Sequence, residues 1–89
     1  MLYLITYDLC QPGRDYAPVY AAIKALSTGQ WCRPLESVWI VKSSLDVNGI
    51  YNRIKPLVDE SDRFLVTELT DNISWYLDEK VSDYLETLL

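Results

Sequence analysis

The chain has 89 residues, is 49% hydrophobic and carries a net charge of −5 from 8 basic and 13 acidic side chains. This length fits one small domain with a marginal core, for which oligomerisation is a natural source of further burial. The acidity argues against tight binding of a long nucleic acid, whose phosphates favour a basic surface. Because the sequence holds no histidine, histidine-based acid–base catalysis and the common zinc sites are excluded. Any catalysis would then have to use carboxylates, tyrosines, lysines or a metal ion bound by oxygen.

The sequence also bears on location and on redox state. No apolar run approaches the ~20 residues of a membrane span, and no secretory signal pattern is visible, so we expect a cytoplasmic protein. The two cysteines, Cys10 and Cys32, are too few for a disulfide scaffold and have no histidine to complete a zinc site. We expect both to be reduced residues of the core or its rim.

The first predicted element is a strand over residues 2–9, bounded by a turn signal at residues 11–13. Its apolar, β-branched and aromatic side chains lead to a single acid, Asp8. Period-two alternation divides the side chains between two faces: Leu2, Leu4, Thr6 and Asp8 on one, and Tyr3, Ile5, Tyr7 and Leu9 on the other. Because both faces are apolar, we expect this strand to be central and covered on both sides. Asp8 then either solvates the strand end or begins a functional site.

A helix is predicted next, with Asp15 as its cap, Pro18 in its first turn and Gly29 beyond its end. Its buried stripe has helical spacing and consists of Tyr16, Val19, Tyr20, Ile23 and Leu26. The period then changes to two: residues 36–42 predict a strand, and residues 31–33 predict a shorter extended piece before it. Pro34 marks an edge, a bulge or a tight reversal, so the two pieces form either one bent strand or a hairpin.

The rest of the chain predicts a helix, a strand and an arm. The helix is capped at Ser44 or Asp46, ends near Pro56, and is expected to bury Val47, Ile50, Tyr51, Ile54, Leu57 and Val58. Residues 63–69 predict another strand that is apolar on both faces. Residues 71–89 predict an arm with a short helix, whose inward side we expect to carry Val81, Tyr84, Leu85 and Leu88.

This order of elements is close to the ferredoxin-like βαββαβ plan, an α+β fold with two helices on one face of an antiparallel sheet. We expect a single domain over residues 1–89, with a core at 1–70 and a C-terminal arm at 71–89 that lies at a subunit interface. Two helices shield one face, whereas at least three strands are apolar on both faces. The other face is therefore closed by a partner chain or by the arm, and we expect a homodimer or a larger oligomer.

Several segments resemble the second CRISPR-associated protein family, the small ferredoxin-like endonucleases of the adaptation complex. The resemblance is carried by Tyr7-Asp8-Leu9, Glu36-Ser37-Val38-Trp39 and the strand at 63–69. Within that superfamily the chain is most similar to the branch named SinR, through residues 4–9, 12–16, 22–26, 37–41, 54–56 and 65–70. The match spans nearly the whole chain in short, apolar motifs.

The resemblance implies a dimer in which the strand-end acids of the two subunits face each other and hold magnesium for phosphodiester hydrolysis. Asp8 is then the catalytic residue and the metal ligand, and Ser37 is a polar neighbour. Magnesium suits a protein without histidine, because it keeps most of its waters and needs one or two carboxylates. Arg14 and Arg33 flank the expected rim around Asp8 and are candidates to hold a phosphate, together with Tyr7.

The second function class is a non-catalytic oligomer that captures a nucleotide-like small ligand or a protein partner, as a counter-defence protein of a phage or mobile element would. A small acidic protein suits this task, because a small anion needs only a few arginines and backbone N–H groups. Asp8 then simply solvates the strand end. Trp31, Trp39 and Trp75 are then core or interface aromatics rather than base-stacking platforms.

Overall fold

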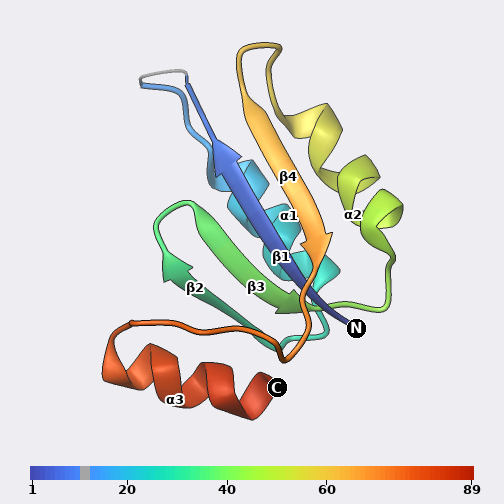
Figure 1. Cartoon of the computed structure of the whole chain (residues 1–89). Helices are drawn as coiled ribbons and strands as arrows, with labels where there is room; N and C mark the ends of the chain where they lie inside the picture. The colour runs from blue at the N-terminus through green and yellow to red at the C-terminus, as the bar shows by residue number, and fades with distance from the viewer. Residues whose placement is uncertain (11–12) are drawn as a thin grey trace.

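The computed structural model describes residues 1–10 and 13–89, so most of the turn predicted at residues 11–13 lies outside the described residues. The elements follow in the order β1 (Leu2–Asp8), α1 (Ala17–Leu26), β2 (Trp31–Leu35), β3 (Val38–Lys42), α2 (Val47–Ile54), the 3₁₀ turn η1 (Lys55–Leu57), β4 (Arg63–Glu68) and α3 (Glu79–Leu88) (Figure 1). Within these residues the chain forms a small α+β structure with a four-stranded antiparallel sheet. The topology is compatible with the ferredoxin-like plan.

The first strand is central, as its two apolar faces predict. The strand order is β2-β3-β1-β4, and β1 pairs antiparallel with β3 on one side and with β4 on the other. Ile5 lies opposite Trp39 of β3 and Val66 of β4, and its side chain is fully buried. The alternation of β1 is also confirmed, because Tyr3 and Ile5 belong to one core and Leu2 to another.

Helix α1 lies behind the sheet in Figure 1, α2 is seen beside β4, and both helices contribute side chains to the first core. The α1 stripe is confirmed: its fully buried members Val19, Ile23 and Leu26 are flanked by the half-buried Tyr16 and Tyr20. Helix α1 begins at Ala17, whose N–H donates to the Asp15 carboxylate over 2.9 Å, so this acid supports the first turn from just outside the helix.

Helix α2 is capped by Asp46, which accepts a hydrogen bond from the Gly49 N–H over 2.7 Å. Its buried stripe is narrower than predicted, since only Ile50 and Ile54 are fully buried. The prediction was wrong for Val47 and Tyr51, which are 36% and 45% exposed. The eight-residue helix meets the sheet along one narrow line of positions, and the Tyr51 ring packs sideways on Phe64, 5.2 Å between centroids.

Residues 31–42 form a hairpin, which decides between the two interpretations of this segment. The predicted strand at 36–42 begins too early, because Glu36 and Ser37 form the turn and β3 starts at Val38. The register of β2 and β3 shifts between Cys32 and Leu35, where Pro34 has no N–H to donate. Pro34 therefore marks both an edge strand and a bulge.

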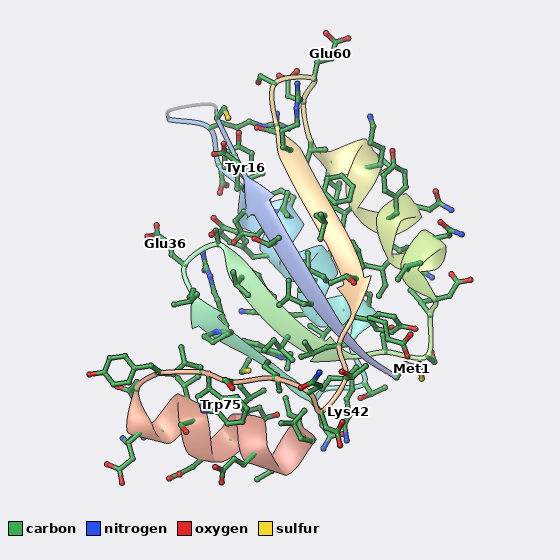
Figure 2. All side chains as sticks on the ribbon, in the orientation of Figure 1. Met1, Tyr16, Glu36, Lys42, Glu60 and Trp75 are labelled. Atoms are coloured by element: carbon green, nitrogen blue, oxygen red, sulfur yellow. The ribbon has the colours of Figure 1, made fainter. Side chains whose placement is uncertain are left out.

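The C-terminal arm and α3 close part of the opposite face within the same chain. A second core forms there from Leu2, Cys32, Ile40, Leu85 and Leu88, with Leu69, Trp75 and Leu77 packed against it. Figure 2 shows Trp75 between the arm and α3, where its indole N–H donates to the Ser82 hydroxyl over 2.9 Å. Tyr84, predicted to face inward, is 38% exposed.

The arm does not cover the whole face. Leu65 on β4 and Leu35 on β2 each keep 56% of their surface exposed.

Cys32 is buried in the second core, whereas Cys10 is exposed, and neither forms a disulfide. In the part of the chain that the structure describes, no helix combines the length and apolar character that crossing a membrane requires.

Candidate functional site

A cavity of about 450 Å³ opens at the end of the sheet, where β1 runs past β3. The β1–β3 register stops at Thr6, whereas the β1–β4 register continues to Asp8. Beyond Thr6, the Tyr7 N–H connects β1 to the hairpin by donating to the Ser37 carbonyl over 3.2 Å. The cavity is lined by the end of β1, the start of α1 and the β2–β3 hairpin, through Tyr7, Asp8, Leu9, Tyr16, Tyr20, Arg33, Glu36 and Ser37. Figure 2 shows Tyr16 and Glu36 at this end of the sheet.

Arg33 is the basic residue of this cavity, and strand β2 of the hairpin carries it. Its Nε donates to the Glu36 carbonyl over 2.8 Å. Its guanidinium carbon lies 4.6 Å from the centroid of the Tyr20 ring and 5.1 Å from that of Trp39. Both distances are within the range of cation–π attraction. Arg33 is therefore held in one orientation by a carbonyl and two aromatic rings.

The Tyr7 hydroxyl completes the support of Arg33. It accepts a hydrogen bond from the Trp39 indole N–H over 3.0 Å and one from Arg33 Nη2 over 3.2 Å. It donates to the Glu36 carbonyl over 3.1 Å. Burial raises the pKa of Tyr7, although the Trp39 hydrogen bond and the Arg33 charge act in the opposite direction. The phenol is therefore neutral at physiological pH and serves as a fixed hydrogen-bonding group.

The positive charge of Arg33 has no carboxylate partner within residues 1–10 and 13–89. The salt bridges formed there both belong to Arg14. Two N–H groups of Arg33 are engaged, one by the Glu36 carbonyl and one by the Tyr7 hydroxyl. Figure 2 shows the Glu36 side chain directed outward from the hairpin turn, while its carbonyl accepts from Arg33. The remaining guanidinium donors are thus available to an anion in the cavity.

Asp8 lies at the rim of the same cavity with an exposed side chain. Its register partner across the sheet is Arg63. The two form no salt bridge in the described chain, because Arg63 Nη1 donates instead to the carbonyls of Glu60, over 2.5 Å, and Asp62, over 2.8 Å. Asp8 lines this cavity together with Ser37, and an exposed carboxylate is the kind of ligand that magnesium takes from a protein. Among the described residues no three Asp, Glu or Cys side chains form a metal-binding group.

The structure brings together Tyr7, Asp8, Arg33 and Ser37, but it places Arg14 elsewhere. Arg14 donates to the Leu57 carbonyl over 3.1 Å and forms long ion pairs with Asp59 and Asp62, at 3.6 and 3.7 Å. Arg14 therefore links the loop before α1 to the loop before β4 and is not among the residues that line the cavity.

Asp62 is a structural residue that the sequence pattern does not single out. Its buried carboxylate accepts hydrogen bonds from the Cys10 N–H over 3.0 Å, the Tyr16 hydroxyl over 2.8 Å and the Asp59 N–H over 2.8 Å. The Asp59 N–H, followed by these other donors and the Arg14 charge, lowers the pKa of Asp62. Through this carboxylate the two loops fix the Tyr16 ring at the cavity.

The aromatic lining is also richer than predicted. Tyr16 and Tyr20, expected as core residues, line the cavity, and the Arg33 guanidinium lies over the Trp39 ring.

A comparison of the chain with protein-family models, curated proteins and solved structures finds no match in any of the three. Function is therefore inferred from the side chains of this cavity.

Proposed function

We propose that this protein binds a small, anionic, nucleotide-like ligand in the cavity at the end of β1, with Arg33 as its anion-binding residue. The observation that carries the proposal is the fixed guanidinium of Arg33, which is oriented by Tyr7, Tyr20 and the Glu36 carbonyl. It has no carboxylate partner in the described chain. An arginine that is already ordered loses little conformational entropy when a phosphate or carboxylate binds to it.

The size and charge of the molecule favour a small ligand over a polymer. A cavity of about 450 Å³ is within the ~300–1,000 Å³ of small-molecule sites. The net charge of −5 disfavours an extended phosphate backbone, whereas one anionic group needs only a local cation. Tyr16 and Tyr20 supply aromatic surface for a flat ring next to that group.

The second candidate is magnesium-dependent phosphodiester hydrolysis, the activity that the resemblance to the CRISPR-associated family implies. It is favoured by one observation: Asp8 lines the same cavity as Arg33 and Ser37. Asp8 would hold the metal, and Arg33 would bind the phosphate. When bound, magnesium would activate water and stabilise charge on the phosphate.

We also propose that the chain assembles into a homodimer or larger oligomer through the part of the sheet face that α3 leaves uncovered. Leu35 and Leu65 support this, because each keeps more than half of its surface exposed on that face. Sedimentation at micromolar concentration should give at least a dimer, and Leu65→Asp should shift it toward the monomer. A wild type that sediments as a monomer would contradict the proposed assembly.

The binding proposal is tested by calorimetric titration of the wild-type protein with adenosine 5′-monophosphate. Arg33→Gln should weaken binding by about tenfold or more, the usual effect of losing a charge-assisted hydrogen bond. Arg53→Gln is the matched control, because Arg53 is exposed on α2 and lies outside the cavity lining. Equal affinities for the wild type and Arg33→Gln, or no binding to the wild type, would refute the proposal.

Asp8→Asn separates the two candidates. If the protein only binds, removing the Asp8 charge should strengthen nucleotide binding in the presence of a chelator, since like charges no longer repel. If Asp8 holds magnesium, the same variant should abolish metal-dependent cleavage of short DNA and RNA and weaken binding when magnesium is present. Cleavage that Asp8→Asn leaves unchanged would rule out Asp8 as the catalytic acid.

A further inference from the structure

A second, shallower cavity of about 380 Å³ adjoins the first at the end of β1. It lies between β1 and β4 and is lined by Thr6, Tyr7, Asp8, Arg63, Phe64 and Leu65. Tyr7 and Asp8 line both cavities, so the two cavities adjoin at the end of β1. The side chains of Phe64 and Leu65 add apolar surface to this second cavity.

Arg63 is the basic residue of the second cavity, as Arg33 is of the first. Backbone carbonyls orient both guanidinium groups: Glu36 for Arg33, and Glu60 with Asp62 for Arg63. Over the described residues neither arginine forms a salt bridge. The Asp62 carboxylate forms its ion pair with Arg14 and accepts hydrogen bonds from Cys10, Tyr16 and Asp59, while it is the Asp62 carbonyl that accepts from Arg63. Each cavity thus contains one oriented cation that lacks a carboxylate partner.

We infer that the ligand of this site carries two phosphate groups, one bound at Arg33 and the other at Arg63, as in a dinucleotide. This inference rests on the proposed function and narrows its ligand class. Asp8 lines both cavities, and its negative charge disfavours a phosphate held beside it. It therefore favours two separate anionic positions. Two linked phosphates bind more tightly than one, because the second contact forms within the same molecule.

The test compares adenosine 5′-monophosphate with the linear dinucleotide pApA, which has two phosphate groups, by calorimetric titration in the presence of a chelator. Wild-type protein should bind pApA at least about tenfold more tightly than the mononucleotide. Arg63→Gln should abolish that advantage and weaken mononucleotide binding far less than it weakens pApA binding. Arg53→Gln, the matched control, should retain the advantage in full.

The outcomes distinguish this inference from the proposal on which it rests. Equal affinities of the wild type for the two compounds, with mononucleotide binding still dependent on Arg33, would overturn the two-phosphate inference alone. That inference also fails if Arg63→Gln retains the dinucleotide advantage, or weakens mononucleotide binding as strongly as dinucleotide binding. Failure of the wild type to bind either compound would overturn the proposed function as well. Circular dichroism and thermal melting of each variant establish that a loss of affinity does not come from unfolding.

Discussion

Truncating Leu85 to alanine tests whether the C-terminal helix docks on the sheet of its own chain. Leu85 is fully buried in the second core, together with Leu2, Cys32 and Ile40. A buried leucine-to-alanine change costs about 2–5 kcal/mol, because transfer energy is lost and a cavity remains. An 89-residue chain is expected to have a total stability of only about 4–13 kcal/mol. The substitution should therefore remove a large part of the stability.

A loss of about 3 kcal/mol corresponds to a fall in Tm of roughly 12–24 °C for a domain of this size. Thermal unfolding followed by circular dichroism measures this change directly. Glu86→Ala is the matched control: it lies next in α3 and is exposed, so its effect should stay within about 0.5 kcal/mol. If Leu85→Ala lowers Tm no more than Glu86→Ala does, helix α3 does not pack on this sheet and Leu85 does not belong to a second core.

Two further predictions concern the first core and the loops. Ile5→Asp places an unpaired charge in the fully buried centre of β1. This costs several kcal/mol, so the variant should be unfolded by circular dichroism, and a folded variant would show that β1 is not central. The lowered pKa of Asp62 contributes stability that is present above about pH 4 and is lost as pH falls through the folded-state pKa. At pH 7 the Asp62→Asn variant should therefore have a lower Tm than the wild type. Its Tm should fall less than that of the wild type when the pH is lowered below 4, whereas the exposed control Asp71→Asn should keep the pH dependence of the wild type.

The sequence predicted the parts of the fold that depend on local periodicity and on the residues that cap helices or form turns. The alternation around Ile5, the buried stripe of α1 and the Asp46 cap are confirmed because each follows from neighbouring residues. The prediction that Val47 and Tyr51 of α2 are buried was wrong, because helical spacing determines which face is apolar but not how much of that face contacts the sheet.

The cavity itself was not predictable from local pattern. It exists because β1 pairs with β4 further along than it pairs with β3, and because the β2–β3 hairpin brings Arg33 over Trp39. These are contacts between segments far apart in the chain, so no short window of sequence contains them. The sequence nevertheless indicated Asp8 through its position at the strand end, and it placed Arg33 at the same rim, although it placed Arg14 there as well.

The central claim, that an anion binds at Arg33, is tested most directly by the indole N–H signals of the protein in ¹H–¹⁵N NMR spectra. The Trp39 indole N–H donates to Tyr7, whose hydroxyl also contacts Arg33, so it senses any ligand at that guanidinium. The Trp75 indole N–H donates to Ser82 in the arm and serves as the internal control. On titration with adenosine 5′-monophosphate, the Trp39 signal should move in a saturable manner and the Trp75 signal should stay in place. A Trp39 signal that does not move, or moves no more than that of Trp75, would contradict binding at Arg33.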